Sequence, residues 1–159
     1  MKRNIARTTL LIAVAALCMS LAPAVQAAEK CSNAKAAGKW GFTLAGTLIL
    51  PTGPVPGAAV GRLSMDAAGN VSGTEARNVG GDFANETITG SWTVNSDCTG
   101  TLTANVYESG VLVRISVFAF VLVDNSSKIR AVQESLKLPD GTPIPAVITV
   151  EGNMLFPDD

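Results

Sequence analysis

Five charged residues lie within segments that are otherwise apolar or alternate between apolar and polar. They are Glu75, Arg77, Arg114, Arg130 and Glu134. If their side chains face a protein interior, they must pair with one another or contact a ligand, because an unpaired buried charge is costly. The apolar neighbours predict that Arg114, Arg130 and Glu134 converge on such an interior. The alternative is that these faces point outward and are solvated.

The chain contains no histidine, which excludes several kinds of active site. A serine–histidine–aspartate triad, a cysteine–histidine pair and a histidine-bound zinc all require an imidazole. No glycine-rich phosphate loop precedes a helix, and no EF-hand pattern occurs. We therefore predict no metal and no cofactor, assign no catalytic residue, and favour a protein that is not an enzyme.

Residues 1–27 have the order of a secretory signal peptide. Lys2, Arg3 and Arg7 precede an apolar run at 9–21, and the small-residue site 25–27 follows, so we expect cleavage after Ala27. The apolar run has 13 residues, whereas a membrane-spanning helix needs about 20. The expected location is therefore exported, either periplasmic or extracellular, with no membrane span in the mature chain.

The mature chain, residues 28–159, has the size of one domain. Three of the 12 basic residues leave with the signal peptide, so it would carry nine basic and 13 acidic residues. That balance leaves no basic patch for nucleic acid. We divide it into an N-terminal segment, 28–38, and a β-barrel domain, 39–159.

Two cysteines, Cys31 and Cys98, remain once Cys18 leaves with the signal peptide. An even number of cysteines in an exported chain indicates a disulfide. This bond would tie the N-terminal segment to the hairpin turn that holds Cys98, and it would stabilise the fold by roughly 4 kcal/mol. Two free thiols or an intermolecular bond are the alternatives.

Eight segments separated by turn residues predict an all-β fold. They are Lys39–Leu50, Ala58–Asp66, Asn70–Asn78, Glu86–Asn95, Gly100–Tyr107, Val111–Asp124, Ile129–Leu138 and Ile144–Glu151. Short connections favour an antiparallel meander, and closure into an eight-stranded barrel would remove exposed edges. A β-sandwich is the alternative.

Alternation within the segments predicts which faces are buried. It places Trp92 in the core. The stretch Val117–Val123 is apolar on both faces, so we expect the N-terminal segment or a second subunit to cover its outer side.

Three stretches carry a resemblance to known proteins. They are GKWGFTLAGTLILPTGPVPGAAVGRLSMDAAGNVSG, GSWTVNSDCTGTLT and FVLVDNSSKIRAV. With their VN-x-DCTGT turn they resemble a family of secreted bacterial proteins without an established activity. The resemblance implies an exported small β-barrel. Gly38-Lys39-Trp40 also resembles the Gly-x-Trp opening of lipocalins, which are ligand-carrying eight-stranded barrels.

Three functions are compatible with these features. The first is a binding module that holds a small apolar molecule in the barrel, with the five charged residues as polar contacts. The second is a solid barrel that acts through its surface as an envelope or extracellular interaction protein. The third is a barrel isomerase or cyclase that uses an interior acidic group. The volume of the interior distinguishes the first from the second.

Overall fold

The computed structural model describes residues 30–157, which form eight strands and one short helix. In chain order the elements are α2 (Asn33–Ala36), β1 (Gly38–Leu50), β2 (Gly53–Met65), β3 (Asn70–Val79), β4 (Asp82–Val94), β5 (Thr99–Glu108), β6 (Val111–Val123), β7 (Lys128–Lys137) and β8 (Ala146–Pro157). Each of the eight expected strands is present. The expected signal peptide lies outside the described residues.

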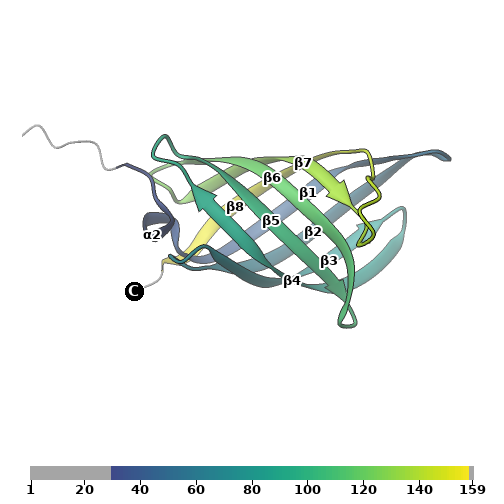
Figure 1. The fold of residues 1–159 in the computed structure, drawn as a ribbon, viewed down its shortest axis with the longest axis horizontal. Helices are drawn as coiled ribbons and strands as arrows, with labels where there is room; N and C mark the ends of the chain where they lie inside the picture. Colours follow the sequence, from purple (N-terminus) through teal and green to yellow (C-terminus); the bar gives the residue numbers. More distant parts are fainter. Residues whose placement is uncertain (1–29, 158–159) are drawn as a thin grey trace, which may run out of the picture.

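The strands close into a single barrel (Figure 1). Each strand pairs antiparallel with the next along the chain, and β8 pairs with β1. This confirms the meander barrel and excludes the two-sheet sandwich. Because the sheet closes on itself, no strand is left with an unpaired edge along its whole length.

Glycines allow the strands to approach closely where the barrel bends. A Cβ atom at Gly90 would collide with the carbonyl oxygen of Thr103, and one at Gly46 would collide with that of Val147. Any other residue at these positions would push the neighbouring strand away. Glycine inside a strand commonly marks such bends.

Strand β2 begins at Gly53, earlier than the sequence indicates. The sequence pattern indicates a turn there because this part of the strand contains two prolines. Pro54 and Pro56 pair with β1, whereas pairing of β2 with β3 starts only at Gly57. This part of β2 therefore has one partner strand. A proline, which lacks the N–H group, is tolerated where one side of a strand is unpaired.

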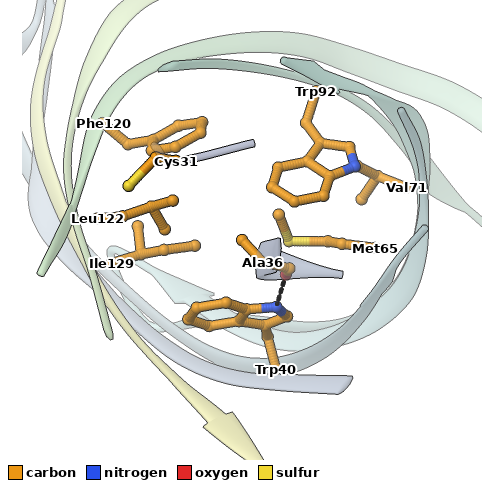
Figure 2. Close-up of a cluster of buried hydrophobic side chains, with 9 residues drawn as sticks. All are labelled: Cys31, Ala36, Trp40, Met65, Val71, Trp92, Phe120, Leu122 and Ile129. Carbon is orange, nitrogen blue, oxygen red and sulfur yellow. Dashed lines mark hydrogen bonds between the residues drawn. The ribbon is translucent and has the colours of Figure 1, made fainter. Parts of the chain in front are cut away.

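The N-terminal segment closes one end of the barrel. Figure 2 shows Ala36 among the side chains inside that end, with its carbonyl oxygen accepting a hydrogen bond from Trp40 Nε1 at 3.1 Å. Trp40 and Trp92 are each only 1% exposed, which confirms Trp92 as a core residue. The buried cluster at this end consists of Cys31, Ala36, Trp40, Met65, Val71, Trp92, Phe120, Leu122 and Ile129. We call this end the plugged end.

The N-terminal segment is fixed at this end by a covalent bond and by hydrogen bonds. The disulfide between Cys31 and Cys98 is present, as expected. Asn33 Oδ1 accepts a hydrogen bond from the Val94 backbone N–H at 2.7 Å, and Asn33 Nδ2 donates to the Trp92 carbonyl at 3.3 Å. The segment is therefore bound to β4 as well as to the turn that follows it.

The described N-terminal segment does not cover the outer face of β6. Ala119 and Val121 on that face are exposed, Val121 to 38%. The expectation that this segment covers them is wrong, because its helix lies at the barrel end and packs against β4.

Candidate ligand-binding cavity

A cavity of about 350 Å³ lies inside the barrel. It extends from Trp40 and Met65 at the plugged end to Leu48, Leu138 and Ile144 at the opposite end. The cavity is not fully enclosed, and Leu138 at this end is 37% exposed. Most of the lining side chains are apolar. Ligand pockets in proteins have volumes of roughly 300–1,000 Å³, so this cavity fits a small molecule.

A cluster of charged side chains lies on one wall of the cavity. Glu75 on β3 and Glu86 on β4 are directly opposite each other in the strand register. Like charges in such a position repel. Arg114 on β6 relieves this repulsion, since its Nη1 donates to Glu86 Oε1 at 2.7 Å and its Nη2 donates to Glu75 Oε1 at 2.6 Å. Arg114 Nη2 also donates to Glu86 Oε2 at 2.7 Å.

Arg77 extends the cluster towards the rim of the barrel. Its Nε donates to Glu86 Oε1 at 2.8 Å, and its terminal nitrogens contact Asp82 at 3.0 Å and Glu108 at 3.5 Å. Exposure of the carboxylate side chains increases from 0% at Glu86 to 44% at Glu108 and 76% at Asp82. The cluster therefore runs from the buried wall to solvent.

The two buried carboxyl groups differ in their affinity for protons. Burial raises the pKa of Glu75 to about 7, and the nearby Glu86 adds to this shift while Arg114 opposes it. Burial also acts to raise the pKa of Glu86, but hydrogen bonds from Arg114 and Arg77 outweigh it and hold that pKa below its usual value. At neutral pH Glu86 is therefore ionised, whereas Glu75 is present in both its protonated and its ionised form.

Gln133 and Ser116 add uncharged polar groups to the cavity wall. Ser116 is 4% exposed. The Oε1 atom of Gln133 is buried and has no hydrogen-bond partner among the described residues. Pairing between β7 and β8 ends at Val132 and Thr149, and Gln133 is the next residue of β7.

Three of the five charged residues singled out in the sequence lie together at the cavity. They are Glu75, Arg77 and Arg114. Arg130 and Glu134 do not join them, so the expected convergence of these two with Arg114 is wrong. The Arg130 side chain is 47% exposed and its Nη1 forms an ion pair with Glu151 at 2.9 Å, and Glu134 is exposed as well.

A β-bulge explains this error. Val117 pairs with Ser135 and the next residue, Phe118, pairs with Gln133, so Glu134 is an extra residue in β7. An extra residue shifts the alternation of the strand from one face to the other. Leu136 and Leu138, which follow the bulge, line the cavity. Counting back from them in steps of two therefore assigns Arg130 to the wrong face.

Among the polar residues of the cavity wall, the sequence analysis missed Glu86, Ser116 and Gln133. The sequence pattern could have indicated Glu86, because it lies an even number of residues from Ile88 and Trp92 and so shares their face of the strand. No such pattern indicates Gln133, because the bulge at Glu134 conceals its phase.

Within residues 30–157, no group of three or more cysteine, aspartate or glutamate side chains is arranged to hold a metal ion. The expectation of no metal and no cofactor stays a prediction. In the same part of the chain, no helix is both long enough and apolar enough to cross a membrane.

Comparisons with known proteins show no family for this chain. No protein-family model matches the chain, and no curated protein matches it. A de novo designed fluorescence-activating β-barrel is similar in structure, with a TM-score of 0.47 and 13% sequence identity over 74% of this chain and 92% of the designed chain. The resemblances to a secreted bacterial family and to lipocalins stay predictions.

Proposed function

We propose that the protein is a non-catalytic binding module that holds one small, largely apolar molecule inside the barrel. The cavity of about 350 Å³ with mostly apolar walls carries this proposal. An eight-stranded barrel is wide enough either to be filled by its own side chains or to hold one small ligand. The presence of this cavity disfavours the alternative of a solid barrel that acts only through its surface.

The charged cluster supplies the polar contacts of the site. Glu75, Arg77 and Arg114 line the same cavity as the apolar side chains. A few polar groups in an apolar pocket orient a ligand and give specificity. Arg130 and Glu134 lie outside and take no part in this proposal.

We also propose that the protein acts after export. The disulfide between Cys31 and Cys98 supports this, because such bonds persist mainly in oxidising compartments. The predicted signal peptide points the same way. Fractionation of the producing cells tests the location, and retention of the full-length chain in the cytoplasm would reject it.

Native mass spectrometry tests the binding function. The protein is purified without organic solvent from the cells that produce it and measured before and after denaturation. We expect an additional small mass that denaturation releases. Ala104→Phe, which places a ring inside the cavity, should lose this mass, whereas the outward-facing Ala45→Phe should keep it. A protein that carries no extra mass in any form contradicts the proposal.

One observation favours an isomerase or cyclase as a second candidate. The Glu75 carboxyl lies at the cavity with a pKa raised to about 7, which suits proton transfer at neutral pH. Incubation of the purified protein with the molecule that co-purifies tests this function. Conversion that is lost in Glu75→Gln would establish it, and recovery of the unchanged molecule would reject it.

A further inference from the structure

Gln133 carries a buried polar atom for which the cavity wall supplies no partner. Its Oε1 atom accepts no hydrogen bond within residues 30–157. An unpaired buried amide oxygen costs free energy, because it has lost the water that solvated it in the unfolded chain. The side chain lines the cavity, and its terminal amide torsion is soft. A turn of the amide therefore brings this oxygen to a molecule inside the cavity, which can supply the missing partner.

The charged cluster indicates the charge that this molecule should carry. Both terminal nitrogens of Arg114 already donate to Glu75 and Glu86. Four carboxylates contact the two guanidinium groups of the cluster, so the acidic groups outnumber the basic ones. The site therefore has no excess positive charge for an anionic ligand, and an unpaired anion in a buried site is strongly disfavoured.

We propose that the cavity selects a small, uncharged, largely apolar molecule with a hydroxyl group that hydrogen-bonds to Gln133. A hydroxyl both donates and accepts, so it satisfies the amide whichever way the amide group is turned. An ether oxygen can only accept. This inference rests on the proposed binding function and adds the chemical class of the ligand.

A matched series of probes tests the inference by calorimetry at neutral pH. Naphthol, methoxynaphthalene and naphthoate share one apolar frame and differ in a single substituent on the same carbon. We expect naphthol to bind roughly twofold to tenfold more tightly than methoxynaphthalene, which is the range for one net hydrogen bond. Naphthoate should bind at least about tenfold more weakly than naphthol, since its charge stays unpaired.

The outcomes separate this inference from the function on which it rests. If naphthoate binds as tightly as naphthol, or methoxynaphthalene does, the cavity binds ligands but the proposed class is wrong. If none of the three binds, the binding function itself fails and the inference fails with it. Neither decision requires a variant.

Two neighbouring variants locate the hydrogen bond. Gln133→Met replaces the amide with an apolar side chain of similar length, and it should remove the advantage of naphthol over methoxynaphthalene. Glu134→Met makes the corresponding change on the outer face and should preserve that advantage. A melting temperature near that of the unmodified protein shows that each variant is folded. Persistence of the full advantage in folded Gln133→Met would overturn the assignment to this residue.

Discussion

The two ends of the barrel are built from the same strands but differ in how their inward-facing positions are filled. At the plugged end, Trp40, Met65 and Trp92 pack around the helix α2 and leave almost no surface exposed (Figure 2). Towards the opposite end, the inward positions hold Leu48 and Leu138, both incompletely buried, beside the charged cluster. The first end is closed by a hydrophobic core, whereas the buried side chains of the second hydrophobic cluster line the cavity; they are Ile88, Ala104, Val106, Phe118 and Ile148.

This difference shows how one closed sheet can serve two purposes. A barrel needs a packed core for stability, and dense packing at one end can supply it. The other end can then remain incompletely filled without unfolding the chain. We therefore expect substitutions at the plugged end to change stability, and substitutions at the cavity to change binding.

The largest effect is expected at Trp92. Trp92→Ala should reduce the free energy of unfolding by about 3–5 kcal/mol, because it leaves a large void in a packed core. Leu48→Ala at the cavity wall is the control, and it should cost about 1 kcal/mol, since this side chain is already partly exposed. Chemical denaturation measures both. Equal losses would remove the distinction between the two ends.

Removal of the disulfide should have the next largest effect. A variant with Cys31→Ala and Cys98→Ala should lose roughly 4 kcal/mol of stability, because the bond closes a long loop with a sequence separation of 67 residues. Denaturation measures the loss. The affinity for naphthol should change little, since neither cysteine lines the cavity. A large loss of affinity in the folded variant would show that the two ends are coupled.

The Glu75 carboxyl should make stability fall with rising pH. Its pKa is raised from 4.5 to about 7 in the folded chain, so the folded state binds the proton more tightly than the unfolded state. The resulting stability is present below pH 4.5 and is lost as the pH rises towards 7, by up to about 3 kcal/mol.

The other charged groups of the cluster should not produce the same fall in stability, so Glu75→Gln serves as the control. Glu86 has a lowered pKa, so its contribution runs in the opposite direction and is lost as the pH falls below the usual range for a carboxyl. Arg77 and Arg114 contact these carboxyls and are present in both proteins of the comparison. From about pH 4 to about pH 8, denaturation midpoints should fall in the unmodified protein and change much less in Glu75→Gln. Parallel curves for the two proteins would contradict the assignment.

The smallest effect is expected at Glu134. Its side chain is exposed on the outer face of β7, so Glu134→Gln should change stability by less than about 0.5 kcal/mol and leave probe binding unchanged. Melting curves and calorimetry measure these quantities. A marked loss of either would place Glu134 in the interior and contradict the bulge.

The sequence predicts the strands and the topology well because both depend on local patterns. Turn residues separate the strands, and the two-residue period places Trp92 in the core. The period fails at Glu134, since the bulge depends on how β6 and β7 pair. The cavity is also beyond reach of the sequence, because its volume depends on how side chains from all eight strands pack together.

Titration of naphthol into a matched pair of variants tests the central claim, that the barrel interior binds a small molecule. Ala104 lines the cavity, whereas Ala45 is exposed on the outside. We predict one binding site per chain in the unmodified protein and in Ala45→Phe. In Ala104→Phe the affinity should fall by at least about tenfold, because the added ring occupies the cavity. Equal affinity in both folded variants would place the bound molecule outside the barrel and contradict the account.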